Sequence, residues 1–235
     1  MWHVQVLTLF PEMFPGSLQY SLAGKAKEIG IWSLKTLNIR DFTADKYKTV
    51  DDTSFGGGPG MVMRPDVVHE SMCLAVQNNP SARKIYLTPK GYPLTQKVVE
   101  NLASSSGIIL LCGRYEGIDQ RVIDAHQMEE ISLGDFVLSG GEPAALALID
   151  ACVRLLPGVL KQKDTLQEES FAQGLLEYHH YTRPAIWQEV SVPDILLSGD
   201  HQRIKDWRFS QAEKLTQQRR PDLWAKYQLD KKTPK

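Results

Sequence analysis

Three glycine-containing segments have the composition of ligand-binding loops, and each lies at the end of a predicted strand. They are residues 88–91 (TPKG), 113–117 (GRYEG) and 133–141 (LGDFVLSGG). One such segment is typical of a simple turn, but three that converge on one edge of a parallel sheet predict a crevice for a ligand. Glycine there allows a ligand to approach the backbone closely.

Other groups that could do chemistry are less distinctive when each is taken alone. The run Gly56–Gly60 lacks the Gly-Lys-Ser/Thr ending of a phosphate-binding loop and has Pro59 where an amide is needed, so we exclude nucleoside triphosphate binding there. Arg154 follows Asp150 by four residues, which favours an ion pair along one helix. Glu168 and Glu169 stand in a polar segment, where solvated carboxylates are the simplest expectation.

The elements that must position these groups alternate along the first two thirds of the chain. Alternation of short apolar runs with helical patterns predicts an α/β fold, with a mostly parallel sheet and helices on both faces. We expect strands over 4–9, 31–37, 84–88, 108–112 and 136–138, and helices over 21–29, 66–77, 95–103, 119–125 and 142–156. The helix over 142–156 is apolar nearly all round, which predicts burial in a core or a subunit interface.

The last third of the chain has a different character. Residues 161–170 are polar and have no amphipathic pattern, which predicts a linker or a mobile lid between a domain over 1–160 and a small helical domain over 171–235. A helix is expected from about His201 to Arg219. Residues 201–235 contain ten Lys/Arg and four Asp/Glu, a balance of +6 within a chain of net charge −1, so this end is expected to face a polyanion.

The cysteines and the apolar runs indicate the compartment. Cys73, Cys112 and Cys152 are dispersed and have no CxxC spacing, which argues against a disulfide framework or a zinc site and favours small core residues in a reducing compartment. No apolar run approaches the length of a membrane span, and the first residues predict a strand, not a signal peptide. We therefore expect a cytoplasmic protein.

Several segments together resemble the bacterial tRNA (guanine-N1)-methyltransferase family. They occur in the family's order, with near-family spacing, over about residues 1–224, and a combination of this length is highly specific. The matching segments are 9–14 (LFPEMF), 40–42 (RDF), 49–52 (TVDD), 56–61 (GGGPGM), 112–119 (CGRYEGID), 134–142 (GDFVLSGGE), 148–150 (LID), 157–160 (PGVL) and 180–184 (HYTRP).

The resemblance implies methyl transfer from S-adenosyl-L-methionine to N1 of the guanine at position 37 of tRNA, next to the anticodon. It also implies a trefoil knot in the N-terminal domain and a homodimer with each active site at the subunit interface. Mg²⁺ is needed by family members, but no ligand cluster in this sequence identifies a metal site. The cofactor pocket that the resemblance implies is lined by Tyr86, Leu87, Pro89, Gly113, Tyr115, Glu116, Leu133, Gly134, Asp135, Phe136, Val137, Leu138, Gly140 and Gly141.

Catalysis needs a base near guanine N1 and a cation near O6, since the lone pair on N1 becomes available only as its proton leaves. The resemblance assigns the cation to Arg154. It assigns the base to Glu169, which stands where the family usually has an aspartate before Ser-Phe. The glutamate carboxylate reaches one methylene further than that of aspartate. Glu168 is the alternative candidate for the base.

Basic residues in both domains are the expected phosphate contacts with tRNA, the C-terminal ones being favoured by the charge asymmetry. They are Lys46, Lys48, Arg183, Arg203, Arg208, Arg219 and Arg220. Two alternatives stay open at this point. One is a knotted methyltransferase that acts on another RNA base or on a ribose hydroxyl. The other is a non-catalytic RNA-binding relative, a hypothesis that the aspartate-to-glutamate change suggests.

Overall fold

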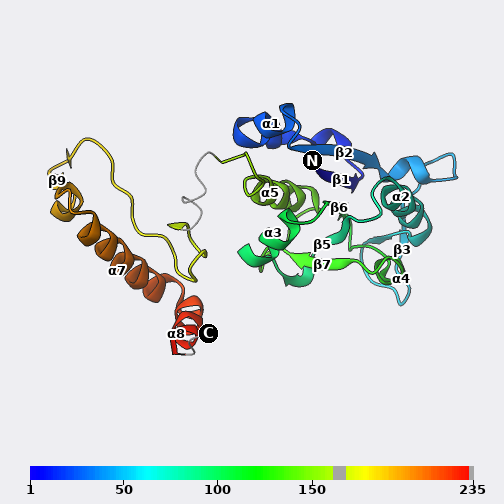
Figure 1. Cartoon of the computed structure of the whole chain (residues 1–235). Helices are drawn as coiled ribbons and strands as arrows, with labels where there is room; N and C mark the ends of the chain where they lie inside the picture. Colours follow the sequence, from blue (N-terminus) through cyan, green and yellow to red (C-terminus); the bar gives the residue numbers. More distant parts are fainter. Residues whose placement is uncertain (161–167, 233–235) are drawn as a thin grey trace. The chain divides into compact units, whose positions relative to one another are not determined.

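The computed structural model describes residues 1–160 and 168–232. The chain divides into two compact units, Met1–Lys161 and Gln162–Lys235, which are treated separately below (Figure 1). The linker that the sequence predicts over 161–170 lies mostly outside the described residues, which resume at Glu168.

The N-terminal unit is built on a five-stranded sheet in the order β2-β1-β6-β5-β7, with every neighbouring pair parallel. The strands are β1 (Trp2–Thr8), β2 (Trp32–Asn38), β5 (Arg83–Pro93), β6 (Gly107–Cys112) and β7 (Glu129–Ser132). All of β6 is buried, and its sequence GIILLC reads as one apolar run, as expected for a parallel strand covered on both faces. A separate antiparallel hairpin joins β3 (Asp51–Thr53) and β4 (Met61–Met63).

Helices cover both faces of this sheet and create two hydrophobic cores. The helices are α1 (Ser21–Glu28), α2 (Pro65–Asn78), α3 (Gln96–Ala103), α4 (Gln120–Ala125) and α5 (Glu142–Val153), with short 3₁₀ helices at Pro11–Met13, Gly16–Gln19 and Ile39–Phe42. Ile108 and Leu110 of β6 lie in the core beneath α1, α3 and α5, whereas Ile109 and Leu111 lie in the core beneath α2 and α4. This division follows from the alternation of side chains along a strand.

Local signals in the sequence explain where several helices begin. The Thr95 hydroxyl accepts a hydrogen bond from the Val98 amide at the start of α3, and the Asp119 carboxylate accepts one from the Arg121 amide at the start of α4. A proline lies in the first turn of both α2 and α5. Amides of the first turn have no partner within the helix, so the missing N–H of proline costs no hydrogen bond there.

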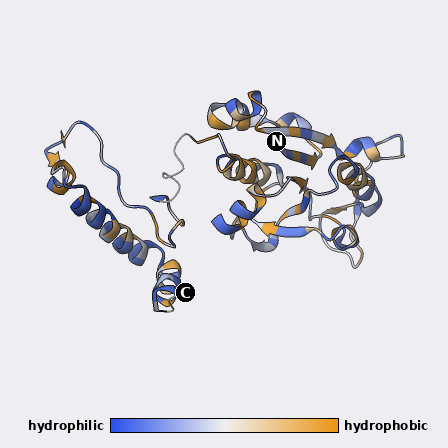
Figure 2. Cartoon of the chain, in the orientation of Figure 1, coloured by the Kyte–Doolittle hydropathy of each residue, from blue (hydrophilic) through white to orange (hydrophobic). Residues whose placement is uncertain are grey.

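Over its described residues, the C-terminal unit includes a small hairpin and the two helices α7 and α8, whose bounds follow. The hairpin pairs β8 (Ile186–Trp187) with β9 (Val190–Ser191), a 3₁₀ helix covers Asp194–Leu197, and the helices are α7 (His201–Arg219) and α8 (Pro221–Lys232). The buried Thr216 hydroxyl accepts from the Leu176 amide at 2.8 Å and donates to the Ala212 carbonyl at 2.7 Å, so it ties the preceding segment to α7. Figure 2 shows α7 as mainly hydrophilic, in contrast to the sheet strands and α5.

Most predicted elements are confirmed to within a few residues, but the predicted strand over 136–138 is wrong. The fifth strand is β7, and residues 136–138 lie in the loop after it, with Phe136 52% and Val137 84% exposed. Their apolar character therefore does not reflect burial in the sheet. The predicted helix over 142–156 ends earlier, at Val153, and α8 follows α7 without having been anticipated.

The expectation that the cysteines are core residues is confirmed for Cys112 and Cys152, which are buried, and is wrong for Cys73, which is exposed.

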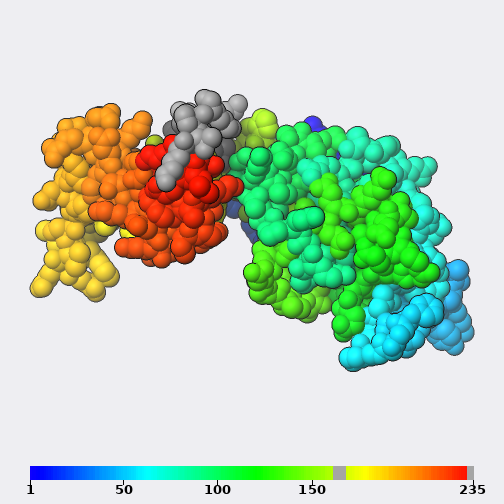
Figure 3. Space-filling view, turned by 90° about the horizontal axis from the view of Figure 1, so that it is seen from below, coloured from blue at the N-terminus to red at the C-terminus, as the bar shows by residue number. Residues whose placement is uncertain are grey.

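Exposed large hydrophobic residues occur near the β3–β4 hairpin, where Tyr47 is 85% and Phe55 98% exposed. This region, drawn in blue to cyan, protrudes at an edge of the N-terminal unit (Figure 3). Over the described residues, no helix combines the length and apolar character needed to cross a membrane. The trefoil knot stays a prediction.

Candidate functional site

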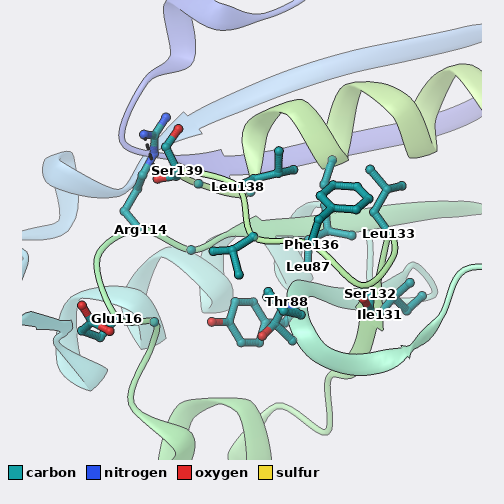
Figure 4. A pocket seen from close by; sticks show the side chains of 18 of the residues that line it. Leu87, Thr88, Arg114, Glu116, Ile131, Ser132, Leu133, Phe136, Leu138 and Ser139 are labelled. Atoms are coloured by element: carbon teal, nitrogen blue, oxygen red, sulfur yellow. Dashed lines mark hydrogen bonds between the residues drawn. The ribbon is translucent and has the colours of Figure 1, made fainter.

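The irregular part of β5 and the loops after β6 and β7 surround one pocket of about 200 Å³ (Figure 4). The segment 88–91, which the sequence predicts as a loop, lies within β5, where the pairing with β7 shifts register between Leu87 and Tyr92. The structure brings together here all the predicted cofactor-binding residues except Asp135: Tyr86, Leu87, Pro89, Gly113, Tyr115, Glu116, Leu133, Gly134, Phe136, Val137, Leu138, Gly140 and Gly141. The sequence reasoning missed the lining residues Thr88, Arg114, Gly117, Ile131, Ser132, Ser139 and Ala144. Most of these lie within or beside the predicted loops, so their position in the sequence was the available signal.

Glycine is required where the loops approach each other most closely. A Cβ atom at Gly141 would lie 2.8 Å from the Cys112 Cα, and the Gly141 amide donates a hydrogen bond to the Gly113 carbonyl at 3.0 Å. A Cβ atom at Gly113 would lie 2.9 Å from the Tyr86 ring. These contacts leave no room for a side chain, so the glycines hold the pocket wall in shape.

The pocket combines apolar side chains with a few polar groups. Phe136, Val137 and Leu138 are 52%, 84% and 37% exposed, which makes this loop an apolar surface beside the pocket. Figure 4 shows Phe136 and Leu133 at one end of the pocket and Arg114 and Ser139 at the other. Such a mixture suits a ligand with a planar ring and a polar tail.

Two tyrosines of the wall have distinct surroundings. Burial raises the pKa of Tyr86 above its usual value, so its phenol is protonated at neutral pH. Tyr115 has a φ of +58°, a conformation that costs about 1–3 kcal/mol for a residue other than glycine and that clusters at ligand sites. Tyr115 lines the pocket from this strained turn, and the residue is 48% exposed.

A buried ion pair connects the pocket to the start of the chain. The Glu142 side chain is 0% exposed; its Oε2 lies 2.9 Å from Arg114 Nη2, and its Oε1 accepts a hydrogen bond from the Thr8 hydroxyl at 2.7 Å. Arg114 also donates to the Ser139 carbonyl at 3.2 Å, and its guanidinium lies 4.3 Å from the centre of the Phe10 ring. The network therefore joins the end of β1, the loop after β6 and the first turn of α5.

The two predicted catalytic residues belong to different units, and each is described within its own. Arg154 directly follows α5 and is half-buried, and its amide bonds to the Asp150 carbonyl at 3.2 Å. Glu169 lines a pocket of about 460 Å³ in the C-terminal unit, together with Glu168 and Arg208. There the Glu168 carboxylate accepts from the Tyr178 hydroxyl at 3.1 Å and lies 3.8 Å from Arg208 Nη1.

The predicted phosphate contacts divide into exposed side chains and paired ones. Lys46, Arg183, Arg203 and Arg219 are exposed. Lys48 pairs with Asp41 at 3.3 Å, Arg208 lies against Glu168 and the Tyr178 ring, and Arg220 forms two hydrogen bonds to Asp222, at 2.9 and 2.6 Å. The paired residues already satisfy a carboxylate within the protein, so the exposed ones are the better candidates for binding an external anion.

Comparison with known proteins gives a consistent result over nearly the whole chain. The family model described as tRNA (Guanine-1)-methyltransferase TrmD matches residues 1–226. A tRNA (guanine-N(1)-)-methyltransferase of Rhodospirillum rubrum is 57% identical over 222 residues, covering 94% of this chain and 92% of the relative. The enzyme of the same name from Bartonella tribocorum is 54% identical over 226 residues, covering 96% of each chain.

The buried ion pair makes a testable prediction. Glu142→Ala leaves the Arg114 side chain, which is only 18% exposed, without its buried carboxylate partner. We therefore expect a loss of about 3–5 kcal/mol in the free energy of unfolding. Glu100→Ala, an exposed carboxylate on α3, is the matched control and is expected to stay within about 0.5 kcal/mol of the parent chain. Urea unfolding at neutral pH measures both, and equal stability of the two variants would contradict the proposed importance of the pair.

Proposed function

This chain belongs to the tRNA (guanine-1)-methyltransferase family, and from that premise we propose that it methylates N1 of the guanine at position 37, on the 3′ side of the anticodon. Methyl transfer to N1 of a tRNA guanine is the activity of the family, which implies S-adenosyl-L-methionine as donor. The single observation that carries the proposal is the convergence of the family's loops on one pocket.

We assign the donor to the pocket formed by the three loops, because its residues fit the parts of S-adenosyl-L-methionine. The exposed apolar surface of Phe136, Val137 and Leu138 suits the adenine ring, and Glu116 offers a carboxylate to a hydroxyl or ammonium group. The glycines at 113 and 141 supply a narrow wall of backbone. When bound, the donor supplies an electrophilic methyl group on its sulfonium.

The chain's own residues must then accept one proton and stabilise one developing negative charge. Guanine N1 carries a hydrogen, so we propose that the Glu169 carboxylate accepts this proton as the N1 lone pair attacks the methyl group. The Arg154 guanidinium would hold the negative charge that develops on O6. Glu168 is held by Tyr178 and Arg208, which supports a structural role for it, and the order of the family motif assigns the base to Glu169.

We further propose that exposed basic residues of the C-terminal unit bind the tRNA backbone. Arg203 lies in the first turn of α7 and Arg219 is its last residue, so the two span 16 residues of helix. At a rise of about 1.5 Å and a rotation of about 100° per residue, the two lie roughly 24 Å apart along the axis and project from nearly opposite sides of the helix, so each would contact a separate phosphate. Arg183 and Lys46 are exposed in other segments and are further candidates.

A homodimer with active sites at the subunit interface is part of the proposal. Its support in the structure is the apolar surface on and just after α5, where Ala147 is exposed and where Leu146, Ala151 and Leu155 pack against the core but are only half-buried. We also propose a cytoplasmic location, since tRNA is the substrate class. A requirement for Mg²⁺ stays a prediction, and no residue is assigned to it.

The central test follows methyl transfer from labelled S-adenosyl-L-methionine to tRNA transcripts that carry guanine or adenine at position 37. We expect labelling only of the guanine transcript, mapped to N1. Equal labelling of both transcripts would favour another RNA site, and donor binding without turnover would favour a non-catalytic relative.

The same assay tests the catalytic assignments. Glu169→Gln and Arg154→Ala are expected to lower kcat by about 10²–10⁴-fold with little change in donor affinity, because each acts on the guanine and not on the donor. Glu168→Gln is the control and is expected to stay within a few-fold of the parent rate. The base would be reassigned if Glu168→Gln, and not Glu169→Gln, lost activity.

Binding of tRNA is expected to weaken when exposed arginines of α7 are removed. The double variant Arg203→Ala/Arg219→Ala should lower affinity and reduce the slope of log affinity against log salt by about one per lost phosphate contact. Lys27→Ala, an exposed cation on α1, serves as the control. A salt slope equal to that of the parent chain would remove both arginines from the RNA surface.

Light scattering after size exclusion tests the dimer. We expect twice the mass of one chain, and we expect Ala147→Glu to shift the protein towards monomer because it places a charge in the proposed apolar interface. Ala125→Glu makes the same change at an exposed position of α4 and should leave the dimer intact. A monomeric parent chain at micromolar concentration would overturn this part of the proposal.

A further inference from the structure

Two histidines and a cysteine lie together on the N-terminal unit, outside the residues that line the donor pocket. They are His69, Cys73 and His126, and their candidate ligand atoms all lie within 4.8 Å of one another. His69 Nδ1 is 3.0 Å from His126 Nε2, and His69 Nε2 is 3.4 Å from Cys73 Sγ. Nothing in the proposed methyl transfer uses these side chains.

The backbone holds this cluster in place. His69 and Cys73 are four residues apart on α2, so they lie on the same face of the helix. His126 directly follows α4 as its C-cap. The two helices pack in one hydrophobic core through Val68, Met72 and Val122, which fixes the separation of the three side chains.

The chemistry of the cluster matches a zinc site. Imidazole nitrogen and thiolate sulfur are the preferred ligands of Zn²⁺, with bonds of about 2.0–2.1 and 2.3 Å. In a tetrahedral complex those bond lengths place nitrogen and sulfur ligands roughly 3.5 Å apart. The distance from His69 Nε2 to Cys73 Sγ is 3.4 Å, and the candidate ligand atom of His126 lies within 4.8 Å of those of the other two residues.

The surroundings also suit a bound cation. His69 and Cys73 are exposed, so an ion can enter from solvent, while His126 is half-buried. The thiolate formed at Cys73 on binding would partly neutralise the added charge.

We propose that His69, Cys73 and His126 bind one Zn²⁺ per chain, with water at the fourth position, and that the ion fastens α2 to the end of α4. Three protein ligands with a fourth open position form a recognised zinc arrangement. The cluster shares no residue with the pocket proposed for the methyl donor, so the ion would act apart from methyl transfer.

Titration with Co²⁺ tests the site, because tetrahedral Co²⁺ bound to a thiolate has visible and near-ultraviolet absorption bands. The full chain, freed of metal with a chelator, is expected to bind one Co²⁺ with a sulfur-to-metal band that Zn²⁺ displaces. Cys73→Ser should abolish that band, and His69→Ala and His126→Ala should each weaken binding by at least about tenfold. His201→Ala, an exposed histidine of α7, is the matched control and should bind as the parent chain does.

Thermal unfolding supplies an independent readout. A ligand that binds the folded state raises its stability by mass action, so Zn²⁺ should raise Tm in the parent chain and in His201→Ala but not in the three ligand variants. Methyl transfer by the ligand variants should equal that of the parent chain. Absence of the sulfur-to-metal band, or equal metal binding by parent and ligand variants, would overturn the proposal whether or not the proposed function holds.

Discussion

The structure of the pocket at the carboxyl ends of the parallel strands depends on one buried carboxylate. Glu142 is removed from solvent at the start of α5, where the partial positive charge of a helix N-terminus favours an anion. Burial of a carboxylate is costly unless it is paired and hydrogen-bonded, and here Arg114 and Thr8 meet both conditions. Because these partners come from the loop after β6 and the end of β1, the carboxylate fixes three elements that are far apart in the sequence.

The pocket is a consequence of that arrangement combined with parallel pairing. Parallel strands bring the irregular part of β5 and the loops after β6 and β7 to one edge of the sheet, and Arg114 then bonds to the Ser139 carbonyl in the loop after β7. Gly113 and Gly141 bring the second and third loops into direct backbone contact. The apolar side chains Phe136, Val137 and Leu138 are left beside the pocket, outside both cores.

Much of this architecture could be predicted from the sequence, because alternating apolar runs and helix caps are local signals. The errors arose where local pattern and tertiary environment disagree. The run over 136–138 reads as a strand, yet the β5 edge is occupied by β7, whose EEIS sequence has little strand character. Cys73 was expected in the core, but its place on α2 faces solvent. Neither the Arg114–Glu142 pair nor the cluster around His69 could be foreseen, since both join residues distant in the sequence.

The glycine-lined wall also limits which point mutations could make this protein resistant to an inhibitor. A compound that fills the pocket and bonds to the main chain around Gly113 and Gly141 contacts atoms that every substitution retains. A side chain at either position would collide with Cys112 or Tyr86 and would disturb the wall itself. Resistance by point mutation is therefore expected where side chains line the pocket, as in the exposed loop containing Val137, where an exchange of side chains leaves the backbone wall intact.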